Sequence, residues 1–203
     1  MLIYLKTWFF ELFEQIQVQR SFYHNYLFRQ KDKALLRAYR WRSAYKISKD
    51  YLINQGEANI YQYGETPLTT VNKIAKSFEI TQNDYVIELG AGRGRAALFL
   101  SEYVGCKVKA VEKIPEFASK MVASQNLKMV TEDMVESKFE SSTVVFLYGT
   151  TLPEDIIIQL ARRIPFGVKL ITISYPIAAF DSKYRTKKVI KGRFPWGKTE
   201  VYL

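Results

Sequence analysis

A buried strand that runs directly into a glycine-rich turn constrains this chain more than any other stretch. Residues 85–89 read Tyr-Val-Ile-Glu-Leu, and residues 90–95 read Gly-Ala-Gly-Arg-Gly-Arg. Glycines at alternate positions allow a ligand to approach the backbone closely. The next segment, 95–104, is apolar on one face and predicts a helix. In open α/β sheets, a nucleotide-like ligand binds at such a turn, beyond the carboxyl end of the first strand.

The spacing of the glycines discriminates between ligand classes. A dinucleotide fingerprint requires G-x-G-x-x-G, but Arg95 and Ala97 stand where its last glycine would have to fall. A pyrophosphate would also lie beside the carboxylate of Glu88, like charge against like charge. S-adenosylmethionine instead carries a sulfonium and an ammonium, so the pattern favours this cationic cofactor. The glycines expected around it are Gly90, Gly92 and Gly94.

The next two predicted strands also end in acids. Residues 107–112 end in Glu112, which lies 24 positions after Glu88. This is close to the spacing of about 20 residues that places a carboxylate on the ribose hydroxyls of a nucleotide. A third short strand leads into Asp133 and Met134. We expect Asp133 to accept a hydrogen bond from the adenine amine and Met134 to pack on the adenine ring.

Size and composition indicate a folded protein with one domain, or one domain and an appendage. The chain has 203 residues, of which 48% are hydrophobic and 25% charged. The single cysteine, Cys106, excludes an internal disulfide and predicts a reducing intracellular compartment, cytoplasmic or nuclear. With His24 as the one histidine, the sequence offers no His/Cys metal cluster and argues against a Ser-His-Asp arrangement.

The N-terminal region predicts a helical subdomain. Residues 1–14 are apolar and aromatic, but they are too short and too charged to span a bilayer, and they lack a basic start and a cleavage site. Residues 15–54 contain neither glycine nor proline and predict two or three helices. We therefore expect a basic helical subdomain over 1–54 and an S-adenosylmethionine-binding domain over 55–203.

The net charge of +10 is concentrated at the two ends of the chain. Residues 1–50 and 183–203 each carry +6, whereas residues 51–182 carry −2. Basic ends of this kind predict contact with a polyanion, with DNA favoured over an anionic membrane; a solvated charged surface is the alternative. The residues considered for DNA contact are Arg37, Arg40, Arg42, Lys187 and Lys188.

The rest of the pattern completes an α/β architecture. Thr66 followed by Pro67 predicts a helix start, with Thr66 as N-cap and Pro67 in the first helical position. Seven strands with alternating helices and a closing antiparallel pair predict the Rossmann-like sheet of class I methyltransferases. Further predicted helices cover 67–78 and 153–163, and further strands cover 143–148, 169–174, 186–192 and 198–203.

Residues 61–180 resemble the non-SET histone lysine methyltransferases of the disruptor-of-telomeric-silencing (DOT) type. The motifs shared with them are Tyr-Gly-Glu-Thr at 63–66, Glu-Leu-Gly-Ala-Gly-Arg-Gly at 88–94, Val-Glu-Lys at 111–113, Glu-Asp at 132–133 and Ser-Thr-Val-Val-Phe-Leu at 142–147. The resemblance implies a lysine methyltransferase acting on a histone or nucleosome. It also implies that Tyr63 and Thr66 cover the methionine moiety and that Lys113 belongs to the cofactor site.

The chain departs from that family at three positions. The family usually has aspartate where Glu88 stands, phenylalanine where Met134 stands, and an Asn-Asn pair where this chain has Tyr148 and Gly149. The core is also similar to small prokaryotic and mitochondrial protein-lysine methyltransferases, one branch of which modifies a membrane subunit of ATP synthase. The alternatives therefore include a lysine methyltransferase of a non-histone or membrane protein.

The expected chemistry is an in-line displacement at the sulfonium carbon, for which the protein supplies alignment and a dry site. Deprotonating a lysine from a pKa of about 10.4 costs roughly 4–5 kcal/mol at neutral pH, and an apolar aromatic channel lowers that pKa by desolvation. The aromatic residues considered for this channel are Tyr148, Tyr175 and Trp196. No dedicated base is evident.

The segment after the fourth strand, Tyr-Gly-Thr-Thr at 148–151, lacks the Asp/Asn-Pro-Pro-aromatic motif typical of adenine, cytosine-amine and glutamine methyltransferases. Its absence argues against methylation of DNA bases and glutamine. An RNA or small-molecule methyltransferase and a non-catalytic nucleic-acid-binding module remain as alternatives.

Overall fold

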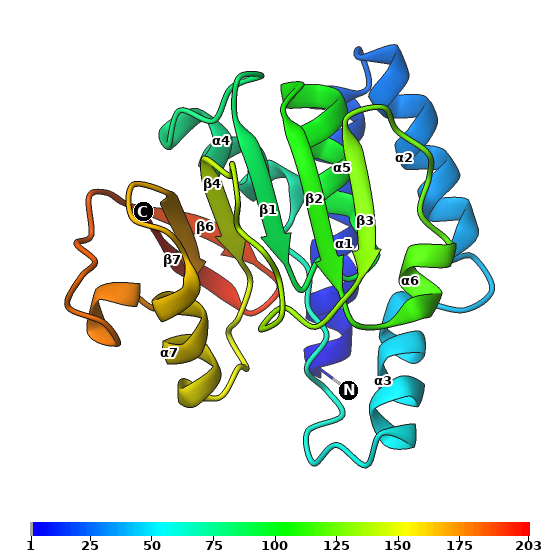
Figure 1. Ribbon diagram of the computed structural model, residues 1–203. Coiled ribbons are helices and arrows are strands. Elements are labelled where there is room, and N and C mark those ends of the chain that lie inside the picture. Colours follow the sequence, from blue (N-terminus) through cyan, green and yellow to red (C-terminus); the bar gives the residue numbers. More distant parts are fainter. Residues whose placement is uncertain (1) are drawn as a thin grey trace.

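Seven strands form one mixed sheet in the order β3-β2-β1-β4-β5-β7-β6 (Figure 1). The computed structural model describes residues 2–203, with side chains from Leu5 onward. The strands β1 to β5 are parallel, and β7 runs antiparallel between β5 and β6. This is the predicted class I methyltransferase architecture. The strands are β1 (Tyr85–Leu89), β2 (Lys107–Glu112), β3 (Leu127–Thr131), β4 (Val144–Leu147), β5 (Lys169–Ile173), β6 (Val189–Phe194) and β7 (Gly197–Tyr202).

The central strands are mostly apolar, with Glu88 of β1 and Thr172 of β5 as buried polar exceptions, because helices cover both faces of the sheet (Figure 1). In β1, the register pairs Glu88 with Ala110 of β2 on one side and with Phe146 of β4 on the other. The carboxyl ends of these three strands therefore meet at one edge. The chain order reverses beside β1, and such a switch point is where open α/β sheets bind ligands.

The helix after the glycine turn is not α-helical along its whole predicted length. The segment α5 (Arg95–Phe99) continues as a π-helix, η1 (Leu100–Val104), and ends at Gly105, which has a φ of +91°. The buried thiol of Cys106 follows immediately before β2. The other helical segments are α6 (Pro115–Ser119), α7 (Glu154–Arg163) and the 3₁₀ turn η2 (Ile177–Ala179).

The start of helix α4 (Leu68–Ser77) differs from the prediction. Pro67 is the N-cap and no side-chain cap bond is made, so Thr66 does not cap the helix. Instead, the carboxylate of Glu14 accepts hydrogen bonds from the backbone N–H of Thr69 at 2.9 Å and from its hydroxyl at 2.7 Å. A carboxylate at a helix N-terminus is favourable because it meets free N–H groups and the positive end of the helix dipole. The cap is therefore supplied from elsewhere in the chain.

Three helices precede the sheet domain: α1 (Leu2–Phe22), α2 (Tyr26–Ala38) and α3 (Ala44–Asn54). Phe22 and Phe28 pack edge-to-face on Phe99 of α5, with ring centroids 4.9 and 5.3 Å apart. The N-terminal helices thus share one hydrophobic core with the sheet domain. The domain boundary at residue 54 stays a prediction. Within residues 2–203, no helix is both long and apolar enough to cross a bilayer.

A buried ion pair fastens these helices to α5. Asp32 of α2 is 0% exposed and accepts from Arg95 Nε at 2.8 Å and Nη2 at 2.9 Å. The hydroxyl of Tyr23 donates to the same carboxylate at 2.9 Å, and Gln15 Oε1 of α1 accepts from Arg95 at 2.8 Å. Burial, followed by the charge of Asp32, raises the pKa of Tyr23 to about 12. One guanidinium therefore joins α1, α2 and α5.

We predict that Asp32→Ala lowers the free energy of unfolding by about 3–5 kcal/mol, because it leaves a largely buried guanidinium without its carboxylate. Urea denaturation measures the change. Lys46→Ala is the matched control, since its ion pair with Asp50 lies on the surface and should contribute about 0.5 kcal/mol or less. If Asp32→Ala lowers the free energy of unfolding no more than the control does, the Asp32–Arg95 pair does not attach the N-terminal helices to α5.

Candidate cofactor site and the adjoining aromatic cavity

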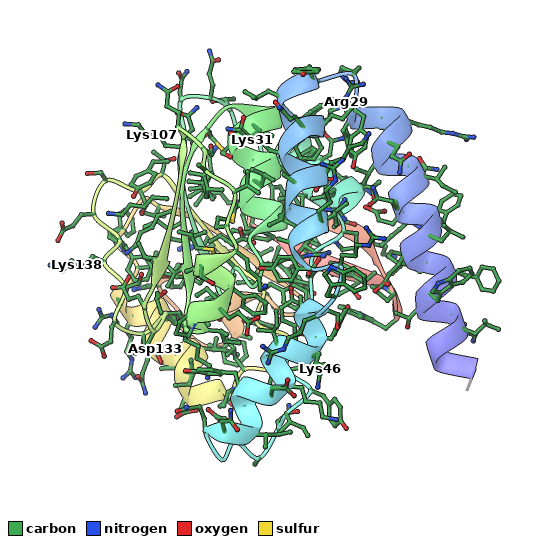
Figure 2. The ribbon with its side chains drawn as sticks, turned by 90° about the vertical axis from the view of Figure 1, so that its right-hand side faces the viewer. Arg29, Lys31, Lys46, Lys107, Asp133 and Lys138 are labelled. Carbon is green, nitrogen blue, oxygen red and sulfur yellow. The ribbon has the colours of Figure 1, made fainter. Side chains whose placement is uncertain are left out.

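A cavity of about 380 Å³ opens at the carboxyl ends of β1, β2 and β3. Its walls come from the glycine turn, from the segments that follow β2 and β3, and from the loop before α4. The predicted site residues that it brings together are Tyr63, Gly90, Gly92, Glu112, Lys113, Asp133, Met134 and Tyr148. Asp133 lies at this end of the sheet, and Lys107, where β2 begins, lies at the opposite end (Figure 2).

The glycine turn requires glycine for two reasons. Gly90, Gly92 and Gly94 have φ values of +69°, +56° and +74°, a region that other residues rarely adopt. A Cβ atom at Gly92 would also lie 2.9 Å from the ring of Tyr63. The turn therefore allows both a left-handed backbone and close contact with the loop above it.

Glu112 holds the turn against the end of β2. Its Oε2 accepts from the backbone N–H of Gly92 at 2.8 Å, and its Oε1 accepts from the N–H of Ile114 at 3.0 Å. Burial raises the pKa of this carboxyl, and the two N–H donors oppose that rise. A carboxylate has about four lone-pair sites. Two backbone bonds thus leave acceptor capacity facing the cavity, which suits the ribose hydroxyls predicted for this residue.

Glu88 does not reach the cavity wall formed by the described residues. Its carboxyl is buried behind the turn, where the backbone N–H of Ala97 donates to it, and burial raises its pKa to about 8. Within residues 2–203, nothing hydrogen-bonds to its Oε2. A buried acceptor without a partner is costly unless something satisfies it. Contact between Glu88 and a cationic cofactor stays a prediction.

The loop over the cavity is tied to the glycine turn by two residues that the sequence analysis did not assign to the site. Arg93 Nη2 donates to Glu65 Oε2 at 2.7 Å. The hydroxyl of Tyr63 donates to the same carboxylate, and its ring packs on Phe117 and Tyr45. Burial and the neighbouring carboxylate of Glu65 raise the pKa of Tyr63. The pair of Glu65 and Arg93 could have been identified from the sequence. The signal is an acid inside the Tyr-Gly-Glu-Thr motif together with an arginine between two glycines of the turn.

Thr66 is a correction to the predicted cofactor site. It is buried, but it lines a different cavity, of about 330 Å³, together with Glu11, Tyr39 and Arg93. The chain leaves the cofactor cavity after Gly64 in order to begin α4, which turns Thr66 toward the N-terminal helices. The role predicted for Tyr63 fits this structure, whereas Thr66 does not reach the cofactor cavity.

The residues at the rim of the cavity make local contacts. Asp133 is exposed, and its Oδ1 accepts from the backbone N–H of Val135 at 2.9 Å. Lys113 Nζ lies 3.4 Å from Glu57 Oε1 across the rim. The methyl group of Met134 lies 3.3 Å from the position of a Cβ on Gly90. The adenine contacts of Asp133 and Met134 stay predictions.

A second cavity, of about 340 Å³, adjoins the first, and five aromatic residues are among those that line it. The two share the loop at 62–64, Tyr148 and Thr151. Trp196 stacks on Phe194 with ring centroids 4.9 Å apart and lies 6.3 Å from the ring of Tyr148. The aromatic residues that line this cavity are Tyr45, Tyr61, Tyr63, Tyr148 and Trp196, and Glu65 adds a carboxylate.

Tyr175 is a second correction, because it does not line the aromatic cavity. Its ring packs in the apolar cluster on the other side of the sheet, against Phe180 at 5.4 Å. Its hydroxyl would lie 2.6 Å from a Cβ on Gly149. Ser174, with a φ of +78°, lines the cavity instead. The turn at Ser174 sends the next side chain away from the predicted channel.

The basic residues predicted to contact DNA differ in their surroundings. Arg42 donates to Glu116 Oε2 at 2.6 Å and to Asp50 Oδ2 at 2.9 Å, so its charge is already paired. Arg37 and Arg40 are exposed. In the C-terminal segment Lys187 is exposed, and Lys188 donates to the carbonyl of Ser77 at 2.7 Å. Contact with DNA stays a prediction.

Over residues 2–203, no group of three or more His, Cys, Asp or Glu side chains is arranged to hold a metal ion.

The fold and the site define a class I methyltransferase. The family model described as "Histone methylation protein DOT1" matches residues 52–161, which is more than half of the chain. The chain therefore belongs to this family, and its fold is that of the S-adenosylmethionine-dependent methyltransferases. The predicted resemblance to the DOT type is confirmed.

The chain is also similar to two curated methyltransferases. It is 25% identical over 114 residues to an "rRNA adenine N-6-methyltransferase" of Limosilactobacillus reuteri, covering 54% of this chain and 46% of the relative. It is 28% identical over 121 residues to a "Ribosomal RNA small subunit methyltransferase A" of Corynebacterium jeikeium (strain K411), covering 56% and 36%. The chain thus spans less than half the length of these curated relatives.

Among solved structures, an RNA methyltransferase from Salinibacter ruber in complex with S-adenosyl-L-homocysteine has a TM-score of 0.57 at 18% identity. The match covers 68% of this chain and 91% of that protein. At this identity, the likeness is one of fold.

We predict that Glu112→Ala weakens S-adenosylmethionine binding by about 2–3 kcal/mol, because a charged hydrogen bond to the ribose is lost and the turn loses its anchor. Calorimetry on the folded variant measures the affinity. Glu140→Ala, at an exposed acid outside the cavity, is the control and should bind like wild type. Unchanged affinity in Glu112→Ala would remove this residue from the site.

The raised pKa of Glu88 predicts a pH-dependent affinity. With a pKa of about 8, the carboxyl is largely protonated at pH 7, and a cationic cofactor favours its ionised form. Affinity should therefore rise between pH 6 and 8, at most about tenfold per pH unit, with release of a proton on binding. Calorimetry in buffers of different ionisation enthalpy counts that proton. Glu88→Gln should lose this release, and identical proton counts in both proteins would contradict the assignment.

Proposed function

We propose that this chain transfers a methyl group from S-adenosylmethionine to the side-chain amine of a protein lysine, with a histone as the first candidate. The observation that carries the proposal is the aromatic cavity that adjoins the cofactor cavity and shares the loop at 62–64 and Tyr148 with it. Membership of the DOT1 histone methylation family supports the choice of acceptor.

In this proposal, the cofactor lies across the carboxyl ends of β1, β2 and β3. Glu112 accepts from the ribose hydroxyls, and the glycine turn accommodates the methionine moiety beside the ring of Tyr63. Glu88 provides a negative charge behind the turn. Asp133 and Met134 bind the adenine at the rim. Tyr63, Gly90, Gly92, Glu112, Asp133 and Met134 already line the cavity, whereas Glu88 and Gly94 do not.

The aromatic cavity suits a long aliphatic amine. Its rings exclude water from the lysine side chain and favour a cation over their faces while it enters. Desolvation then lowers the pKa of the amine, which must lose its proton before it attacks. Bound S-adenosylmethionine would supply the methyl group, with an N–C bond formed as the C–S bond breaks and a neutral thioether as the leaving group. Glu65 is held by Arg93 and Tyr63, so it serves as a fixed charge at the entrance.

An RNA acceptor is the second candidate, because the names of both curated relatives specify ribosomal RNA. The segment 148–151, Tyr-Gly-Thr-Thr, argues against it, since it lacks the Asp/Asn-Pro-Pro-aromatic motif typical of adenine methyltransferases. Labelled-methyl transfer to nucleosomes, free histones, ribosomal RNA and total lysate, followed by mass spectrometry, decides between them. We expect label on a lysine. Label on adenine would overturn the proposal.

We predict that Trp196→Ala lowers kcat/KM for the protein acceptor by about tenfold, the scale of one cation–π contact, and leaves cofactor affinity unchanged. Trp196 lines the aromatic cavity and not the cofactor cavity, so its effect should be confined to the acceptor. Steady-state kinetics and calorimetry measure the two effects. Trp41→Ala, at an exposed ring away from both cavities, should change neither. Equal loss of acceptor and cofactor binding in Trp196→Ala would contradict a role in the channel.

A further inference from the structure

Helix α1 carries apolar side chains on both of its sides: Val18 and Phe22 are buried in the core, whereas a second apolar row faces outward. On the inner side, Glu14 binds Thr69 and Gln15 binds Arg95. Val18 completes the inner side as a buried core residue. A surface helix normally buries its apolar side and exposes its polar side. Here the inner contacts of Glu14 and Gln15 are polar, and a row of large apolar side chains on the opposite side stays exposed.

The outward side carries a continuous apolar stripe. Its members follow the i, i+3, i+4, i+7 spacing of one helix face. Their exposed fractions range from 40 to 56%. In Figure 2, α1 is the outermost helix on one side of the molecule, with side chains projecting away from the body. The stripe consists of Leu5, Trp8, Phe9, Leu12, Phe13 and Ile16.

The charges beside this apolar stripe are positive. Lys6 and Arg20 are exposed on α1, and the guanidinium of Arg193 lies 5.7 Å from the ring of Phe13. The two acids of α1, Glu11 and Glu14, instead line the inner cavity that contains Arg93. Glu14 is turned inward, and Glu11, although exposed, lines that inner cavity, so the charged groups beside the apolar stripe are Lys6, Arg20 and Arg193.

We propose that α1 docks flat on the surface of an anionic lipid bilayer, with the apolar stripe inserted at the boundary between headgroups and acyl chains. Helices rich in Trp, Phe and Leu on one face and flanked by Lys or Arg bind membranes in this way. The basic flanks and the net charge of +10 complement an anionic surface. Pairing of two stripes from two copies would instead bring like charges together. Thr7 of α1 lines the aromatic cavity, so docking holds that cavity close to the membrane.

Flotation with lipid vesicles tests the proposal. We expect wild-type protein to float with vesicles of phosphatidylcholine and phosphatidylglycerol, and far less with phosphatidylcholine alone. The combined variant Trp8→Gln, Phe9→Gln, Leu12→Gln should partition roughly tenfold or more weakly, because the inserted apolar area is lost. Glutamine keeps the helix propensity of these exposed positions.

A matched control removes exposed apolar side chains elsewhere. Leu27, Trp41 and Phe166 are 49, 90 and 97% exposed, and their combined change to glutamine should leave flotation within about twofold of wild type. Both variants should bind S-adenosylmethionine like wild type, which verifies folding. This readout is independent of any methyl acceptor, so failure here leaves the proposed function standing.

Three results would overturn membrane docking. In the first, wild-type protein does not float with either kind of vesicle. In the second, the α1 variant floats as well as wild type. In the third, sedimentation equilibrium shows a wild-type dimer that the α1 variant dissociates, which would assign the stripe to a second copy of the chain.

Discussion

The hydrogen bond from Gly92 N–H to Glu112 supports the rest of the site. It joins the end of β2 to a turn whose left-handed backbone only glycine adopts readily, and it fixes the floor of the cofactor cavity. Because Glu112 is buried, the bond is made in a region of low dielectric, where a carboxylate without donors would be costly. The turn, Glu112 and the start of α5 therefore form one unit, and a change at any of them affects the other two.

The two arginines of the turn extend that unit in two directions. Arg93 binds Glu65 and holds the loop over the cavity. Arg95 binds Asp32 and attaches the N-terminal helices. The alternation of glycine and arginine thus does two things at once. The glycines form the surface that approaches the ligand, while the arginines connect the turn to the elements that cover it. The N-terminal helices are consequently part of the framework of the site.

This arrangement explains why α1 has its unusual orientation. Its polar side chains are used inside the molecule, where Glu14 caps α4 and Gln15 contacts Arg95. The apolar side chains of the first turns are then left outside, beside basic residues. Helix α1 therefore both stabilises the framework of the site and carries the proposed docking surface. Because Thr7 of α1 lines the aromatic cavity, a membrane bound to α1 would lie close to that cavity.

The sequence by itself determined the strand, turn and helix around Glu88, the order of the acids after each strand, and the class I architecture. These features follow from local periodicity and from residues such as glycine whose conformational needs are strict. Only the tertiary structure decided which side chains share a cavity. Thr66 and Tyr175 carry the right chemistry, but the chain turns each away from the predicted site. Glu65 and Arg93 meet across 28 residues, and Glu14 reaches a helix 55 residues away. Contacts at such separations depend on packing, which no local pattern encodes.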